Sequence, residues 1–168
     1  MIIHLGQLIC KNKMMRKHLG FSLLEVMVVM AIIFIIASIA MPPFLRWRTD
    51  AQLRGAASNL RGDLELAKLR AIRENSFVAV LFNANDYIIF VDNGTSAGDW
   101  LEDEDETQIR NGQLPEGVYI VMPTALADDR TRFNGRGTAE NSGTIIVQNI
   151  RGKQKTISIN RLGLINLQ

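Results

Sequence analysis

The sequence KHLGFSLLEVMVVMAIIFIIASIAM, residues 17–41, decides the architecture of this chain. Within Phe21–Met41 only Glu25 and two serines are polar, and a helix of this length spans roughly 32 Å, enough to cross the hydrocarbon core of a bilayer. The first 20 residues carry four bases and no acid, which predicts a cytoplasmic N-terminus and an exported C-terminal part. The stretch therefore predicts one transmembrane helix over residues 21–41.

Three interpretations of this segment are open. The first is a plain membrane anchor, and the second is a secretory signal peptide cut near the small residues Ser38-Ile39-Ala40. Glu25 argues against a disposable signal, because a carboxylate at the membrane centre costs about 2.5–3.5 kcal/mol, although less near the interface. An acid kept in a membrane segment is a candidate functional residue that needs a partner.

The third interpretation rests on residues 17–25, KHLGFSLLE, and on the apolar run that follows them. This motif closely resembles the class III signal of type IV pilins and type II secretion pseudopilins. The resemblance implies that a membrane aspartyl peptidase cuts after Gly20 on the cytoplasmic side, that Phe21 is then N-methylated, and that residues 1–20 are the leader. It also implies that residues 21–41 are kept, first as an anchor and later as the core of a helical filament.

Glu25 has a chemical role in this third interpretation. Cutting after Gly20 frees an α-amine about one helical turn from the carboxylate, which in a filament can pair with the N-terminal ammonium of a neighbouring subunit. A sheltered pair of this kind adds little net energy but fixes register, because an unpaired partner is costly. The leader is long for such a signal, and translation from Met14 or Met15 instead of Met1 would shorten it.

Residues 42–75 are expected to extend the helix beyond the membrane. Pro42 and Pro43 predict a kink or a locally melted stretch, since proline removes an amide donor and clashes with the preceding turn. The long helix of type IV pilins similarly bears a proline at this place. Spacings of three and four then predict an amphipathic face that packs on a sheet: Leu53, Ala57, Leu60, Leu64, Ala67 and Ala71.

The other faces of this helical extension are basic. Two interpretations are open: a solvated face with a few ion pairs, or a contact surface for acidic patches or phospholipid head groups beside the membrane. The charged residues concerned are Arg46, Arg48, Arg54, Arg61, Lys68, Arg70 and Arg73, with Asp50, Asp63 and Glu65 among them.

From residue 76 the pattern changes to short strand-like runs bounded by Asn, Asp, Gly or Pro. The expected strands are Phe77–Phe82, Tyr87–Asp92, Val118–Met122, Thr144–Gln148 and Lys155–Asn160, and residues 83–86 predict a hairpin connection between the first two. No βαβ alternation or Gly-rich phosphate loop appears, which argues against a nucleotide-binding fold. The expected fold class is α+β and pilin-like: a long N-terminal helix, transmembrane and then amphipathic, packed on a small, mostly antiparallel β domain of residues 76–168.

Two further stretches carry a narrower resemblance. Residues 59–73, NLRGDLELAKLRAIR, run into Phe77–Val80 and look like the helix-to-strand segment of the GspH/FimT branch of minor pseudopilins and minor pilins. Residues 132–137, RFNGRG, are similar to a later turn of that branch. The resemblance is continuous over roughly residues 17–82 and loose beyond them.

The composition argues against catalysis. The chain has 168 residues, a formal net charge of +2, one cysteine and two histidines. Cys10, His4 and His18 all lie in the expected leader, so the remainder has no thiol or imidazole for a disulfide framework, a Cys/His zinc site or a Ser-His or Cys-His nucleophile. We therefore expect a protein that is not an enzyme and that holds no cofactor.

Charge is sorted along the exported domain. Residues 86–129 hold eleven acids and one base, whereas residues 130–168 hold seven bases and one acid. The densest acidic stretch, residues 99–106, is interpreted as a solvated loop anchored by Trp100, as a contact for a basic neighbour, or as a weak candidate calcium site at Asp99, Asp103 and Asp105. The spacing of its carboxylates matches no EF-hand.

The basic C-terminal third raises the question of nucleic acid. Some FimT-like minor pilins help competence pili bind DNA, and in them a "GRxR"-type ending supplies arginines for phosphates. This chain ends NRLGLINLQ, residues 160–168, with one arginine and a glycine in another order and without the second base. Nucleic acid is therefore a weak expectation, with a candidate patch at Arg132, Arg136, Arg151, Lys153 and Lys155.

The resemblance, together with the residues above, implies a GspH-like minor pseudopilin in the periplasmic pseudopilus of a type II protein secretion system. The alternative is a FimT/FimU-like minor pilin of a type IV pilus, with a contribution to DNA uptake. In either case the expected location is the bacterial inner membrane, single-pass with a periplasmic C-terminal domain, and then the filament. The expected partners are other pseudopilins or pilins of the same filament, the prepilin peptidase/methyltransferase and inner-membrane lipid.

Overall fold

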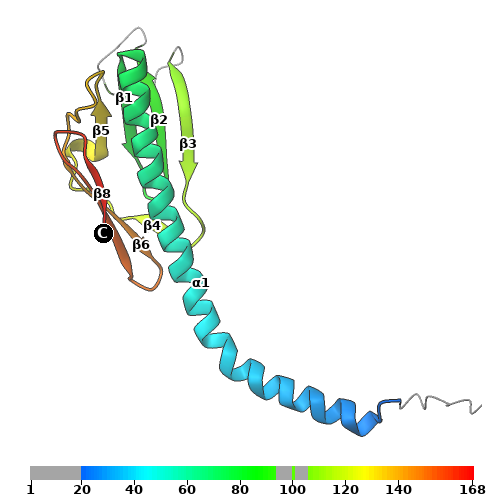
Figure 1. Ribbon diagram of the computed structural model, residues 1–168. Helices are drawn as coiled ribbons and strands as arrows, with labels where there is room; N and C mark the ends of the chain where they lie inside the picture. The colour runs from blue at the N-terminus through cyan, green and yellow to red at the C-terminus, as the bar shows by residue number, and fades with distance from the viewer. Residues whose placement is uncertain (1–19, 94–99, 101–105) are drawn as a thin grey trace, which may run out of the picture. The chain divides into compact units, whose positions relative to one another are not determined.

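A computed structural model describes residues 20–93, 100 and 106–168 of the chain (Figure 1). These residues belong to two compact units, divided between Met41 and Pro42. The helix α1 runs from Leu23 to Glu74 and so has its first part in one unit and its second part in the other.

The first unit holds the apolar beginning of α1. This helix is long and apolar enough to cross a membrane, and its apolar window is not buried by the rest of the protein. Exposed side chains such as Phe34 and Ile39 would be costly in water, and a bilayer would cover them. The helix is continuous through Pro42 and Pro43, so the expected melted stretch is absent at this point, while the kink stays a prediction.

The second part of α1 buries the face that its sequence spacing predicts. Leu53, Leu60 and Leu64 are at most 1% exposed, and the alanines of that face are fully buried. All of these residues except Ala57 belong to a hydrophobic core with side chains from both sheets. The amphipathic face is therefore confirmed, and its alanines leave room for close packing against the strands.

Two four-stranded sheets complete this unit, with the strand orders β3-β2-β1-β5 and β4-β6-β7-β8. Every paired strand is antiparallel, which confirms the α+β, mostly antiparallel fold class. The strands are β1 (Phe77–Phe82), β2 (Asp86–Asp92), β3 (Thr107–Gln113), β4 (Val118–Ile120), β5 (Arg130–Phe133), β6 (Gly143–Asn149), β7 (Gln154–Ile159) and β8 (Ile165–Leu167), and a 3₁₀ turn, η1, spans Ala127–Asp129.

The five expected strands are present within two residues of their expected ends. The hairpin between the first two is confirmed, because Phe82 pairs with Tyr87 and the amide of Asn83 donates to the carbonyl of Asp86 at 2.9 Å. The strands β3, β5 and β8 were not expected. Edge strand β3 is largely exposed and polar, so it shows no alternation of apolar residues, and β5 carries two arginines.

Candidate functional site

The N-terminal motif lies where α1 begins. Gly20, Phe21 and Ser22 precede the first helical residue, and Gly20 and Phe21 are exposed, with Phe21 at 80%. The amide of Val26 donates to the carbonyl of Ser22 at 3.2 Å and so closes the first turn. The bond between Gly20 and Phe21 therefore lies outside the helical hydrogen-bond ladder and is exposed.

Glu25 lies in the first turn of α1 and is exposed. A carboxylate in this position interacts favourably with the amides at the helix N-terminus. Within the part of the chain that the structure describes, Glu25 forms no ion pair with a basic side chain. Glu25 therefore lies exposed at the helix end that follows Gly20 and Phe21.

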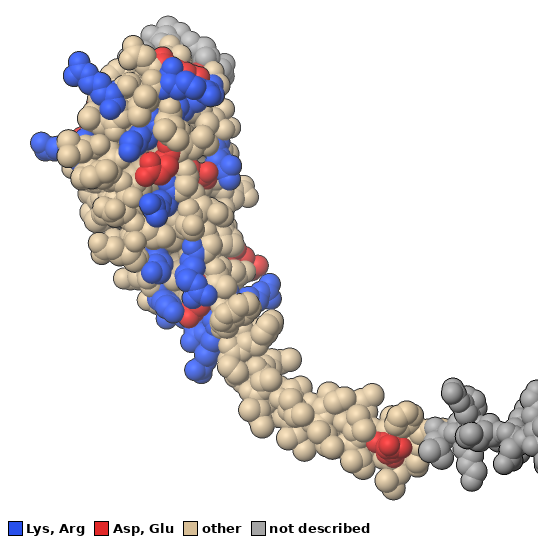
Figure 2. Space-filling model, in the orientation of Figure 1, with Lys and Arg blue, Asp and Glu red and all other residues tan. Residues whose placement is uncertain are grey.

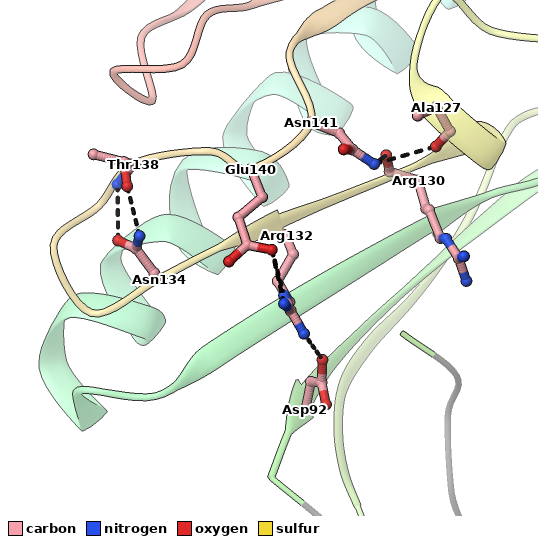
Figure 3. A network of polar contacts seen from close by, with 8 residues as sticks. All are labelled: Asp92, Ala127, Arg130, Arg132, Asn134, Thr138, Glu140 and Asn141. Carbon is pink, nitrogen blue, oxygen red and sulfur yellow. Dashed lines mark hydrogen bonds and ion pairs between the residues drawn. The ribbon is translucent and has the colours of Figure 1, made fainter. Parts of the chain in front are cut away.

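One member of the candidate nucleic-acid patch, Arg132, is buried (Figure 3). Its Nη1 donates to Asp92 Oδ2 at 2.7 Å, and its Nη2 and Nε donate to Glu140 Oε2 at 2.7 and 3.1 Å. The guanidinium also lies over the rings of Phe77 and Trp100, with its Cζ 4.4 and 4.2 Å from their centroids. Arg132 is therefore engaged by acids within the domain, and the assignment of the five bases to nucleic acid stays a prediction.

The turn after β5 is built by Asn134. Its Oδ1 accepts the amides of Arg136 and Thr138, at 2.9 and 3.2 Å, and its Nδ2 donates to the Thr138 hydroxyl at 2.6 Å (Figure 3). Gly135 packs against the end of α1, where a Cβ atom would come within 3.0 Å of the Asn75 Cα. This turn of the RFNGRG stretch therefore joins β5 to the end of the helix.

The remaining members of that patch are divided between two places. Arg136 lies beside Asn75, just beyond the end of α1, whereas Lys153 Nζ donates to Asp50 Oδ2 at 2.7 Å. Residues 50 and 75 are about 37 Å apart along a helix. Arg136 and Lys153 therefore lie near opposite ends of the second part of α1, too far apart to share one binding surface.

Asp50 is the acid that lies beside Lys153, Arg151 and Arg54. The Lys153 hydrogen bond is the main cause that lowers the pKa of Asp50 below its ordinary value of 3.8, and the charges of Arg151 and Arg54 act in the same direction. The Asn149 amide adds a longer hydrogen bond to Asp50, at 3.4 Å. A turn between β6 and β7 is thereby joined to the helix.

The solvated-face interpretation of the basic helix is only partly right. Arg54, Arg61 and Arg73 are exposed, but Lys68 Nζ donates to the Gly163 carbonyl at 2.9 Å and Asp63 is buried. Charged residues of this helix therefore also connect it to the rest of the domain, Lys68 to the turn between β7 and β8, and Asp63 to β2 and β3.

Asp63 forms a polar contact that the sequence pattern did not reveal. It accepts hydrogen bonds from the Tyr87 hydroxyl and from Arg110 Nε, the latter at 2.8 Å. Burial is the first cause that raises the pKa of Tyr87 above its ordinary value of 10.0, and the Asp63 carboxylate is the second. The only available signal was an acid at a helix position next to the apolar face.

The structure offers no candidate metal centre in the described ranges 20–93, 100 and 106–168. The proposed calcium ligands Asp99, Asp103 and Asp105 lie outside those ranges. Trp100, between them, is half-buried against Arg132, and its carbonyl accepts a hydrogen bond from Arg130 Nη1 at 3.4 Å.

Two family models match the chain in adjoining parts. The model for type II transport protein GspH matches residues 56–163. The chain belongs to the GspH family. The prokaryotic N-terminal methylation motif matches residues 15–41, which include the Gly20-Phe21 bond and Glu25. GspH proteins are structural, pilin-like subunits and not enzymes, so the family places this chain among minor pseudopilins and pilins.

Solved structures of that group share the fold. The minor pseudopilin EpsH from the type 2 secretion system of Vibrio cholerae has a TM-score of 0.51 and 13% identity, covering 70% of this chain and 96% of its own. The type IV minor pilin FimU of Pseudomonas aeruginosa has 0.55 and 16%, covering 73% and 92%. Escherichia coli GspH has 0.53 and 16%, covering 70% and 88%. A sequence search of curated proteins gave no match.

Proposed function

We propose that this chain is a minor pseudopilin of a type II secretion system, assembled into a periplasmic pseudopilus after removal of its leader. The observation that carries the proposal is that one chain matches both a methylation motif, over residues 15–41, and the GspH model, over residues 56–163. In this arrangement residues 21–41 serve as the inner-membrane anchor, with the C-terminal domain in the periplasm.

The processing step is assigned to Gly20 and Phe21. A prepilin peptidase/methyltransferase cuts the bond between them and methylates the new α-amine of Phe21. Their exposure ahead of the first helical residue supports this assignment, because an enzyme must bind the bond in an extended form.

The assembly step is assigned to Glu25. In the filament its carboxylate pairs with the N-terminal ammonium of the next subunit while apolar helices surround both charges. An unpaired charge in that setting is expensive, so the pair selects one register along the filament. Pro42 gives the helix a place to bend where it leaves the anchor.

A type IV minor pilin is the second candidate function. Its support is the likeness to FimU, whose TM-score is not lower than those of EpsH and E. coli GspH. Deletion of the gene in its own host separates the two, since loss of exoprotein secretion supports the pseudopilin and loss of surface pili supports the pilin. A contribution to DNA uptake belongs to this second candidate, and it rests on the exposed bases Arg136, Arg151 and Lys153 because Arg132 is buried.

Mass spectrometry of the mature N-terminus tests the processing step. The chain co-expressed with a prepilin peptidase should begin at Phe21 and carry one methyl group, and a Gly20→Val variant should stay uncut. Glu25→Gln should still be cut but should enter filaments poorly, because the amide keeps the shape and lacks the charge. A mature chain that begins at Met41 would refute the proposal.

A further inference from the structure

The turn between β6 and β7, residues 149–153, displays an apolar side chain on a rigid support. Ile150 is 71% exposed, although its own amide donates to the Gly117 carbonyl at 2.9 Å. The fully buried Asn149 accepts the amides of Arg151 and Lys153, both at 3.0 Å, through its Oδ1. Gly152 has a φ of +78°, which the tight turn requires. The turn is thus held in one conformation, so little conformational entropy is lost when the Ile150 side chain inserts into another surface.

This turn is joined to the part of α1 that follows the proposed anchor. Asp50 receives hydrogen bonds from Lys153 and Asn149, at 2.7 and 3.4 Å. Ile150 also lines a groove with Leu45 and Arg48 of the helix. The tip of the turn and the helix segment just after Pro43 therefore share one side of this unit.

Basic side chains surround this side. We define the juxtamembrane basic cluster as Arg46, Arg48, Arg54, Arg151 and Lys153, all exposed. Figure 2 shows a group of basic side chains at the lower end of the unit that holds the sheets, and other basic side chains along the same face up to its upper end. Asp50 lies within the cluster and Glu116 lines the groove, so the five bases outnumber these two acids.

Two aromatic residues lie in the same part of α1 as Arg46 and Arg48. Phe44 and Trp47 are 59% and 62% exposed, and their ring centroids are 6.1 Å apart. Tryptophan is enriched at the boundary between head groups and acyl chains, where one end of the ring is apolar and the other is polar. We therefore place these two rings at the head-group boundary, where the proposed anchor leaves the hydrocarbon core of the bilayer.

The positive-inside rule, which orients membrane helices, disfavours bases that follow the helix on its exported side. Arg46, Arg48 and Arg54 follow the apolar segment on the side proposed to be exported, where bases oppose the bias set by the leader. An anionic bilayer surface gives them a favourable role, because each Lys or Arg beside such a surface adds about fivefold to binding.

We infer that the juxtamembrane basic cluster and Ile150 dock on a surface of anionic phospholipid head groups, with Ile150 inserted at the boundary of the acyl chains. The inference rests on the proposed membrane anchoring of residues 21–41. The docked state holds the β domain against the membrane from which each subunit is taken, and entry into a filament must break it. The anionic lipid around a subunit thereby affects how readily that subunit leaves the membrane for the filament.

The test places one label on the full chain in proteoliposomes. Ile150→Cys, in a Cys10→Ser background, carries an environment-sensitive fluorophore. Leu162→Cys is the matched control, because Leu162 is 72% exposed in another turn. That turn contacts Lys68, about 27 Å further along α1 than Asp50. The vesicles contain phosphatidylcholine alone or mixed with phosphatidylglycerol, and brominated acyl chains act as quenchers.

Quenching at position 150 should appear with phosphatidylglycerol and disappear at high salt, because salt screens the head groups. Position 162 should show neither effect. Arg48→Gln with Arg151→Gln should lower the ratio of docked to undocked domain by roughly fivefold for each base removed. The matched pair Arg136→Gln with Arg161→Gln changes two exposed bases elsewhere and should leave the ratio unchanged.

Three results would overturn the inference. One is equal quenching at positions 150 and 162, another is quenching that ignores the anionic lipid, and the third is cross-linking of position 150 to an acidic protein surface without lipid contact. A chain that is cut after Gly20 and enters filaments but gives any of these results keeps its proposed function and loses only the lipid contact. A chain that docks but is never cut loses the proposed function instead.

Discussion

Replacing Arg132 by methionine should destabilise the β domain severely. The Arg132 side chain is only 10% exposed and forms ion pairs with Asp92, which is fully buried, and with Glu140, each at 2.7 Å. Methionine fills a similar length between the rings of Phe77 and Trp100 but brings no charge. The variant therefore removes the cation and leaves the buried Asp92 carboxylate in place.

The magnitude follows from the cost of breaking a buried ion pair. Removing one partner of such a pair costs about 3–5 kcal/mol, mostly because the other charge loses its compensation. For a unit of the size of Pro42–Gln168 this corresponds to a fall in Tm of roughly 10–20 °C. Arg136→Met, at an exposed base four residues away, should change stability by less than about 0.5 kcal/mol.

The assay is urea unfolding of the fragment Pro42–Gln168, followed by circular dichroism and by tryptophan fluorescence. Adding Asp92→Asn to Arg132→Met should recover part of the loss, because a neutral amide replaces the carboxylate. A loss of under about 1 kcal/mol in the single variant would refute the reasoning, since it would mean that the Asp92 charge does not depend on Arg132. Equal losses in the single and double variants would refute it as well.

Three further predictions concern contacts within the unit that holds the sheets. Tyr87→Phe removes a hydrogen bond to a buried carboxylate and should cost about 1.5–3 kcal/mol at neutral pH. Because the folded-state pKa of Tyr87 is raised, the unfolded chain loses its proton first, so wild-type stability should fall as the pH rises above 10.0 and the variant should fall less, as measured by urea unfolding across pH. The pKa of Asp50 is lowered, so the Lys153 contact stabilises the fold above pH 3.8 and is lost as the pH falls further. Asp50→Asn should therefore reduce the fall in stability below pH 3.8, as measured by urea unfolding. An unchanged fall in the variant would contradict the stabilising role of the Asp50–Lys153 contact. Gly112 of β3 lies against the Tyr87 ring, so Gly112→Ala places a Cβ into that ring and should cost about 1–3 kcal/mol. Gly55→Ala, with open space on an exposed helix face, should instead add about 0.5–1 kcal/mol to stability. Calorimetry that ranks the two variants in the reverse order would contradict the close approach of Gly112 to Tyr87.

The elements with a regular apolar period could be predicted. The buried face of α1 repeats every three or four residues, and β1, β2, β6 and β7 are short runs rich in branched apolar residues. The strands β3 and β5 could not be predicted in this way. An edge strand has one free side and needs few apolar residues, and the arginines of β5 are made compatible with burial by acids elsewhere in the chain.

The candidate sites divide along the same line. Gly20, Phe21 and Glu25 are neighbours in sequence, so a local motif is enough to propose their roles. The nucleic-acid patch grouped five bases by sequence alone, and the structure separates them. Arg132 meets Asp92 across 40 residues, and Lys153 meets Asp50 across 103.

The sequence by itself determined what depends on neighbours along the chain: an apolar helix long enough for a membrane, its processing motif, and the amphipathic face that continues it. Only the tertiary structure decided which charges remain available. Arg132 is buried within an ion-pair cluster, and Asp63 is buried beneath Tyr87, while the juxtamembrane basic cluster stays exposed around Asp50 and Ile150. The physical reason is that a charge acquires its environment from residues brought together by folding, whereas a helix acquires its pattern from residues three and four positions away.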